Sequence, residues 1–243
     1  MVYYFIFFFL NLSILLLIIM NLAIIPARKS SKRIKNKNII DFFGEPIIGK
    51  TIKLLKNTNL FKKIVVTSDS KEILNISKKY GAEIYLRKKK LAGDKIPIIN
   101  VIKDLLNNSD FNINNVFYFY ATSIFIKKKY LLDSLKILKK KSDSMVLSVC
   151  EYSHPIERSL VMNSKNEIEF KYKKNVLKQT QFFKKSYYDA GQFGVAKKEY
   201  FLNNGKKNKK IIGYVLNDHE ACDIDNPKDL KKAKFLFRKL KNE

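Results

Sequence analysis

Short apolar runs alternate with amphipathic stretches of helix length along almost the whole chain after Met20. The apolar runs span residues 22–25, 63–67, 83–86, 116–120 and 145–149, and the amphipathic stretches span 46–57, 71–80, 98–106 and 127–140. Strands of a parallel sheet that is buried on both faces read as continuous apolar runs, and the connections between them are usually helices. The pattern therefore predicts an α/β fold with a mostly parallel sheet and helices on both faces.

The pattern changes after Tyr152. Residues 160–163 and 167–172 flank a Ser-Lys-Asn turn and predict a β-hairpin, which we interpret as a small β excursion from the core, such as a dimer arm. A further strand over 211–216 and a final helix over 227–240 complete the expected domain, which covers residues 20–243.

The chain of 243 residues has a formal net charge of +26, which would ordinarily suggest nucleic acid or an anionic membrane as a partner. Lysine is abundant everywhere, however, and glycine (8), proline (5) and tryptophan (0) are scarce, as in a protein from an AT-rich genome. We therefore interpret the charge as a solvated basic surface. Two cysteines and two histidines, without a CxxC pair, indicate neither a disulfide framework nor a zinc site, and fit the cytoplasm.

Residues 1–19 are apolar and nearly long enough to span a bilayer. They lack both a basic residue ahead of the apolar run and a small-residue cleavage site, so they do not resemble a signal peptide. We expect either a start codon set too early, with Met20 as the true first residue, or a membrane anchor. A membrane partner is expected only in the second case.

Ligands of open parallel sheets bind at the carboxyl ends of the strands. The segments that follow the predicted strands are residues 26–38, 68–69, 87–94, 121–125 and 154–158, and these are the candidate site segments.

Two of the chain's segments compete as the phosphate-binding loop. Residues 44–51 (GEPIIGKT) match the Walker A pattern GxxxxGK[ST], but Pro46 has no amide to donate and favours the first turn of a helix, which would place Lys50 in a helix interior. Residues 26–38 directly follow the first strand and combine cations with Ser30 and Ser31. Arginine and lysine hold oxyanions in complementary ways, so we favour this second segment.

The same segment opens a series of motifs that resembles a known family. IIPARxxSKRIxxKNI is followed by FxGxPII, a strand that ends in TSD, then KKYGAE, LRxxxLAxD and a late DID-P. In this order, from about Leu22 to the C-terminus, they resemble the cytidylyltransferases that activate nine-carbon acidic sugars, the nonulosonic acids. YATSIF, HPIERSL and YYDAGQF resemble the branch that uses pseudaminic acid.

The resemblance implies a Rossmann-like nucleotidyltransferase fold, a homodimer, no nucleic-acid partner, and transfer of CMP from CTP to the sugar's anomeric hydroxyl with Mg²⁺, for bacterial surface or flagellar glycan synthesis. The nucleotide would be bound by Arg28, Ser31, Lys37, Asn38, Arg87 and Asp94; the sugar by Tyr120, Thr122, Arg158, Asp189 and Gln192; and the metal by Asp223 and Asp225. Arg28, Lys37 and Asp225 would be catalytic.

Asp223 and Asp225 are two residues apart. If the segment is extended, its side chains alternate between two faces, so both carboxylates point to the same face and can share a hard cation. Asn226, Pro227 and Asp229 are also typical of a helix N-terminal cap, so an acidic cap is the alternative.

The chain departs from the family pattern at several positions. Lys29 and Ser30 stand where glycines are usual, Lys35 and Ile124 stand where prolines are usual, and Gln179 stands where an arginine is expected. Three alternative functions stay open: a cytidylyltransferase for another nonulosonic acid such as N-acetylneuraminic acid, a metal-dependent glycosyltransferase, and a basic nucleic-acid-binding module.

Overall fold

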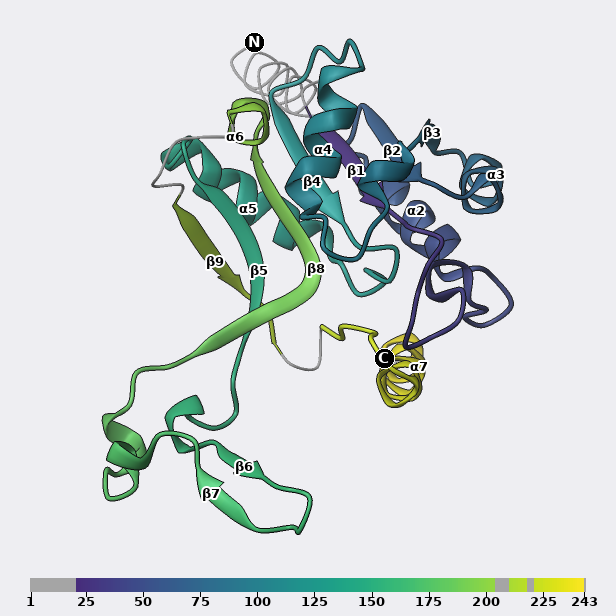
Figure 1. The fold of residues 1–243 in the computed structure, drawn as a ribbon. Coiled ribbons are helices and arrows are strands. Elements are labelled where there is room, and N and C mark those ends of the chain that lie inside the picture. The colour runs from purple at the N-terminus through teal and green to yellow at the C-terminus, as the bar shows by residue number, and fades with distance from the viewer. Residues whose placement is uncertain (1–20, 204–209, 218–220, 243) are drawn as a thin grey trace.

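The computed structural model describes residues 21–203, 210–217 and 221–242. Its main feature is a seven-stranded sheet in the order β3-β2-β1-β4-β8-β5-β9 (Figure 1). The strands are β1 (Asn21–Pro26), β2 (Lys63–Ser68), β3 (Glu83–Leu86), β4 (Asn115–Phe119), β5 (Met145–Glu151), β8 (Tyr187–Lys197) and β9 (Ile211–Val215).

The sheet is mostly parallel. β1 pairs in parallel with β2 and β4, β2 with β3, and β5 with β9, whereas β8 runs antiparallel between β4 and β5. From β1 the chain proceeds outward to β2 and β3, and then returns to place β4 on the other side of β1. Such a reversal leaves a crevice at the carboxyl ends of β1 and β4, where open α/β sheets bind their ligands.

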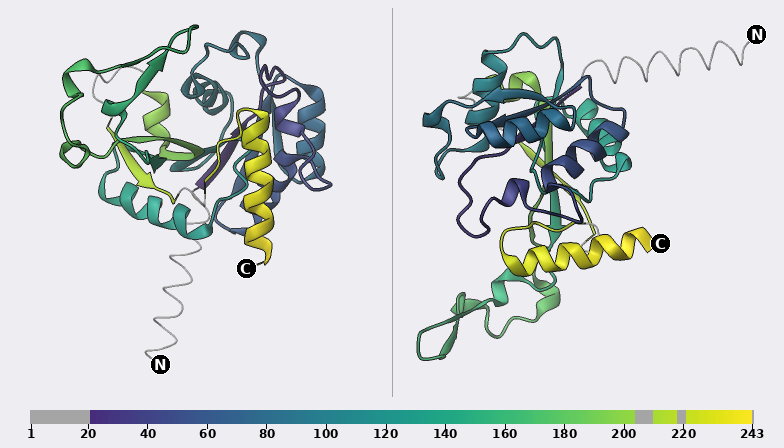
Figure 2. Two further views of the ribbon diagram at one scale, coloured as in Figure 1. Left: turned by 90° about the horizontal axis from the view of Figure 1, so that it is seen from below. Right: turned by 90° about the vertical axis from the view of Figure 1, so that its right-hand side faces the viewer.

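Helices cover both faces of the sheet (Figures 1 and 2). α2 (Ile47–Asn57), α3 (Lys71–Lys79) and α5 (Lys128–Lys140) pack on one face, and α4 (Ile98–Asn107) and α6 (Lys198–Leu202) on the other. The side chains of a strand alternate between faces, so Ala23 and Ile25 of β1 join the first core cluster and Leu22 and Ile24 the second. This is why strands buried on both faces show no polar alternation.

A small second sheet lies in the excursion between β5 and β8. β6 (Leu160–Met162) and β7 (Ile168–Phe170) pair antiparallel, and the segment of residues 152–186, which we call the arm, extends away from the main sheet (Figure 1). The predicted hairpin is thereby confirmed. Short 3-10 turns occur at Lys37–Ile39, Lys89–Leu91, Ile156–Arg158, Lys173–Asn175 and Thr180–Phe182.

The C-terminal helix α7 (Pro227–Asn242) packs through a third core cluster against the segment that follows the first loop. The Phe237 ring lies 5.3 Å from Phe42 and 5.6 Å from Phe43, measured between centroids. This packing carries residues 221–226, just before α7, toward the first loop.

The sequence predicted all of the described α-helices and strands except β8 and α6, with small differences at their ends, and it predicted none of the 3-10 turns. The prediction for residues 1–19 lies outside the described residues. Within the described ranges, no helix combines the length and the apolar character needed to cross a membrane.

Candidate active site

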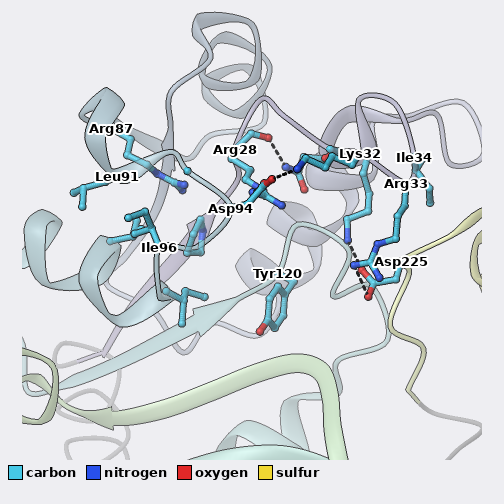
Figure 3. A pocket seen from close by; sticks show the side chains of 17 residues that line it. Arg28, Lys32, Arg33, Ile34, Arg87, Leu91, Asp94, Ile96, Tyr120 and Asp225 are labelled. Carbon is cyan, nitrogen blue, oxygen red and sulfur yellow. Dashed lines mark hydrogen bonds and ion pairs between the residues drawn. The ribbon is translucent and has the colours of Figure 1, made fainter.

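A cleft of about 520 Å³ lies at the carboxyl edge of the sheet (Figure 3). Its walls come from the loop after β1, the segment after β3, the end of β4 and the segment before α7. The lining residues include Arg28, Ser31, Lys32, Arg33, Lys37, Asn38, Arg87, Asp94, Tyr120 and Asp225. The cleft thus brings together segments far apart in sequence, with cations on several sides.

Internal hydrogen bonds shape the loop after β1. The Asn38 side-chain amide donates to the Arg28 carbonyl oxygen at 2.8 Å, and the Lys29 amide donates to Asp69 Oδ1 at 2.8 Å. Asn36 takes a left-handed backbone conformation (φ 54°), which asparagine tolerates better than most residues. Asn38 is therefore a structural part of this loop as well as a lining residue.

Asp94 holds two cations of this loop at the centre of the cleft. Its carboxylate pairs with Arg28 and, at 2.5 Å, with Lys32 (Figure 3). The Lys32 ammonium and then the Arg28 guanidinium hold the pKa of Asp94 below its usual range. Asp94 is therefore an anion that positions the cations.

Asp225 holds two other cations, on the side of the cleft toward α7 (Figure 3). Lys37 Nζ lies 3.0 Å from Asp225 Oδ1, and Arg33 Nη2 lies 2.9 Å from Asp225 Oδ2. These contacts join the loop after β1 to the segment before α7. Lys37 and Asp225 are 188 residues apart in the sequence.

Arg87 supplies a fixed positive charge on the far wall of the cleft. Its Nη2 donates to the Thr67 carbonyl oxygen at 2.8 Å, while its buried Nε has no hydrogen-bond partner in the described structure. Burial lowers the pKa of Arg87 to about 10, and repulsion from Arg28 adds to this effect, whereas attraction to Asp69 opposes it. The guanidinium therefore stays charged at neutral pH.

One side of the cleft is apolar. Leu91, Ile96, Ile98 and Val101 line it beside the ring of Tyr120. Cations at one end and an apolar wall at the other suit a ligand with phosphates and a flat ring, because nucleotide pockets combine apolar lining with a few convergent polar groups.

In the segment before α7, the side chains that cap the helix are not those of the two predicted metal ligands. Asn226 Oδ1 accepts from the Lys228 and Asp229 amides at 2.9 and 3.1 Å, and Asp229 Oδ2 accepts from the Asp225 and Asn226 amides at 2.9 Å each. The predicted cap is therefore present, but the side chains of Asp223 and Asp225 take no part in it. Both alternatives for this segment remain compatible.

The chemistry of Asp223 and Asp225 fits a hard cation. The pKa of Asp223 is raised to about 6, mainly because its carboxyl is partly buried and next because the Asp225 carboxylate repels its charge. Attraction to Lys37 opposes this rise. A bound cation would relieve this penalty, and carboxylate oxygens are the ligands that Mg²⁺ prefers. Among the described residues, no group of three or more histidine, cysteine or acidic side chains is arranged to hold a metal. The two carboxylates would therefore need oxygen ligands from a substrate or from water.

The backbone of β8 comes close to this segment at Gly191, where no other residue type would fit. Gly191 has φ +62°, and a Cβ at its position would come within 2.6 Å of Asp223 Cγ. Only glycine combines this backbone conformation with such a close approach.

A model of the cytidylyltransferase family matches residues 22–236. The chain belongs to the cytidylyltransferase family. It is 32% identical over 225 residues to a pseudaminic acid cytidylyltransferase of Campylobacter jejuni, with 90% of this chain and 96% of that protein covered. It is 26% identical over 227 residues to an N-acylneuraminate cytidylyltransferase of Escherichia coli, with 90% of this chain and 52% of that protein covered.

A solved structure has the same fold at low sequence identity. The structure of CMP:2-keto-3-deoxy-manno-octonic acid synthetase complexed with CTP matches with a TM-score of 0.68 and 12% identity, over 91% of this chain and 99% of that one. The fold prediction is thereby confirmed. The glycosyltransferase and nucleic-acid-binding alternatives are not supported for this cytidylyltransferase.

Residues 44–51 (GEPIIGKT) do not line the cleft, and α2 begins within them. Lys50 lies inside α2, 3.9 Å from Glu45 and 5.7 Å from the centroid of Phe237, and it does not line the cleft. The Walker A alternative is therefore wrong, for the reason that Pro46 indicated: the segment begins a helix.

The structure brings the predicted nucleotide residues together but not the predicted sugar residues. All of Arg28, Ser31, Lys37, Asn38, Arg87 and Asp94 line the cleft, and so do Tyr120 and Asp225. Thr122, Arg158, Asp189 and Gln192 do not. Thr122 and Gln192 are almost fully buried, and direct contact with a sugar stays a prediction for these residues.

Gln192 has a structural role that the sequence did not reveal. Its side-chain amide, 1% exposed, donates to the Cys222 carbonyl oxygen at 3.1 Å and so ties β8 to the segment of Asp223 and Asp225. Asp189 lies on the exposed end of β8, and its Oδ1 accepts from the Gly191 amide at 2.9 Å. Partial desolvation of its carboxyl raises its pKa, against the effect of this hydrogen bond.

Arg158 lies in the arm. It donates to the Val176 carbonyl oxygen at 2.6 Å and stacks 5.3 Å from the centroid of Phe170. The arm extends away from the main sheet of its own chain (Figure 1), and Arg158 does not line the cleft.

Sequence reasoning noted Lys32 and Arg33 only as cations, and it missed the apolar wall. Lys32 and Arg33 pair with the two carboxylates of the cleft, which no local signal showed. The apolar wall had a weak signal, because Leu91 and Ile96 follow Arg87 in the segment after β3.

Proposed function

We propose that this cytidylyltransferase transfers CMP from CTP to the anomeric hydroxyl of pseudaminic acid. The observation that carries the proposal is the cleft, in which cations from two strand ends face one volume that has an apolar wall. The similarity to a pseudaminic acid cytidylyltransferase over 90% of the chain supports the choice of sugar.

In the proposed reaction the sugar hydroxyl oxygen forms a bond to the α-phosphorus, and the bond from that phosphorus to the bridging oxygen breaks, with pyrophosphate leaving. Arg28 and Lys37 would hold the triphosphate, because their charges compensate the negative charge on the transferring group. Arg87 would add a positive charge near the nucleotide, held in place by its burial and by its hydrogen bond to the Thr67 carbonyl oxygen. The apolar wall around Leu91 and Ile96 would take the cytosine ring.

Asp223 and Asp225 would hold Mg²⁺ together with oxygens of the substrate. The bound ion would supply charge neutralisation at the phosphates and a lowered pKa for the attacking hydroxyl. The protein's own contribution is Asp225, which lies 3.0 Å from Lys37 of the loop after β1; Asp223 is two residues away and does not line the cleft.

The choice of sugar rests on the exposed end of β8. Tyr187, Tyr188 and Asp189 are exposed there, and the Tyr188 ring lies 4.9 Å from Tyr152. Pseudaminic acid carries acylated amines on two carbons and lacks the terminal hydroxyl of sialic acid, so aromatic surface with few hydroxyl partners suits its distal part. We also propose a homodimer formed through the arm, and a cytoplasmic reaction, since CTP is a cytoplasmic nucleotide.

The test is a pyrophosphate-release assay with CTP, Mg²⁺ and a panel of nonulosonic acids. We expect kcat/KM with pseudaminic acid to exceed that with N-acetylneuraminic acid by at least ~100-fold, because an unpaired buried hydroxyl and mismatched stereochemistry both cost binding energy in the transition state. Equal or better use of N-acetylneuraminic acid would keep the family and reject this sugar.

A further inference from the structure

Both oxygens of Asp225 are occupied by cations of the loop after β1. Lys37 contacts Oδ1 at 3.0 Å, and Arg33 contacts Oδ2 at 2.9 Å. Asp225 is also one of the two carboxylates that would hold Mg²⁺ under the proposed function. A carboxylate whose two oxygens are both paired with cations is a weakened metal ligand, because the cations repel the incoming ion and already engage one lone pair of each carboxylate oxygen.

The two cations differ in freedom. The Lys37 side chain is 22% exposed, whereas that of Arg33 is 67% exposed. An exposed ion pair contributes little to stability and exchanges readily for a stronger partner. Arg33 is therefore the cation that can leave Asp225.

A triphosphate is a stronger partner for Arg33 than a single carboxylate. Arg33 lines the same cleft as Arg28, Ser31 and Lys37, within the loop that would surround the phosphates (Figure 3). A guanidinium binds phosphate oxygens in a bidentate, charge-assisted geometry, and a triphosphate offers several such sites.

We propose that Arg33 is a positioning residue that holds Asp225 in the nucleotide-free protein and transfers to the triphosphate when CTP binds. The transfer frees one oxygen of Asp225 for the metal at the moment when phosphate oxygens arrive to complete the coordination. The proposal rests on the proposed function. It predicts that CTP promotes metal binding and, by linkage, that the metal promotes CTP binding to the same degree.

The loop offers a matched control. Lys35 is an exposed cation two residues from Arg33, and it neither lines the cleft nor takes part in any of the ion pairs of the described structure. Lys35→Ala removes the same charge from the same loop, so it reports the general electrostatic effect. Arg33→Ala removes that charge and also the contact with Asp225.

Two binding measurements test the exchange without turnover. The first titrates Mn²⁺ into the nucleotide-free protein, followed by the loss of the free-ion EPR signal, because Mn²⁺ takes the same oxygen ligands as Mg²⁺. The second measures CTP binding by calorimetry in EDTA. We expect Arg33→Ala to bind Mn²⁺ at least ~5-fold more tightly than wild type, because Asp225 Oδ2 is no longer paired with a guanidinium. We expect it to bind CTP at least ~5-fold more weakly, because one charge-assisted contact to the triphosphate is lost.

Lys35→Ala should change either affinity by less than about twofold, since its charge is screened by solvent. A melting curve for each variant checks the fold, and Arg33→Gln provides a second variant of similar size.

The outcomes separate this inference from the proposed function. If Arg33→Ala and Arg33→Gln lose CTP affinity but gain none for Mn²⁺, Arg33 is only a phosphate ligand and the exchange is rejected. If they gain Mn²⁺ affinity with CTP binding unchanged, or match Lys35→Ala in both measurements, the exchange is also rejected. Wild-type protein that binds no CTP at all would instead reject the proposed function.

Discussion

The nucleotide cleft and the arm differ in how far each is completed by its own chain. In the cleft, Asp94 and Asp225 each hold two cations, and Asn38 and Asp69 fix the loop that carries these cations. In the arm, apolar side chains face solvent: Leu177 is 96% exposed, and Met162, Ile168 and Phe182 are also exposed. The charged groups of the cleft are therefore paired within one chain, whereas the arm presents exposed apolar surface of the kind that marks protein interfaces.

The largest expected effect concerns the carboxylate on the α7 side of the cleft. Asp225→Asn removes the charge that would hold the metal, so we expect turnover to fall by about 10²–10³-fold. The melting temperature should hardly change, because Asn226 and Asp229 form the cap. Pyrophosphate release and a melting curve measure the two quantities. An active variant with normal Mg²⁺ dependence would show that Asp225 is only structural.

The next effect compares two lysines that were rival phosphate ligands. Lys37→Ala should lower kcat/KM for CTP by about 10–100-fold, because it removes a charge-assisted contact in the cleft. Lys50→Ala should leave it within about twofold, since Lys50 lies inside α2 beside Glu45 and Phe237. Steady-state kinetics at several CTP concentrations distinguish them. The opposite ranking would reject the assignment of the loop after β1.

The third prediction addresses the arm. Leu177→Ser and Phe182→Ser together should shift the protein from dimer to monomer by light scattering, because they replace exposed apolar side chains of the proposed interface. CTP binding should stay within about twofold, since the cleft is built from the main sheet. A matched double change on the exposed polar face, Lys173→Ser with Lys174→Ser, should leave the dimer intact. A monomeric wild-type protein would contradict the prediction at once.

The smallest effect belongs to the cap. Asn226→Ala removes the acceptor for two amides at the start of α7 and should cost about 1 kcal/mol of unfolding free energy. For a domain of this size that corresponds to a fall of about 2–4 °C in melting temperature. Calorimetry measures it. No change in melting temperature would show that solvent satisfies these amides equally well.

Much of the fold could be predicted because buried parallel strands and amphipathic helices leave a periodic record. β8 could not, since it combines two glycines with polar residues and runs antiparallel between β4 and β5. α6 could not either, because five residues are too few to show a helical period.

The sequence by itself indicated that residues 26–38 and 87–94 meet at the carboxyl edge of the sheet, and both segments line the cleft, whereas the predicted segments 68–69, 121–125 and 154–158 do not. Only the tertiary structure decided which charges meet. The pairing of Arg33 with Asp225, and the tie from Gln192 to Cys222, join residues that are distant along the chain. No local pattern encodes them, because such contacts depend on how β8 and α7 pack against the first loop.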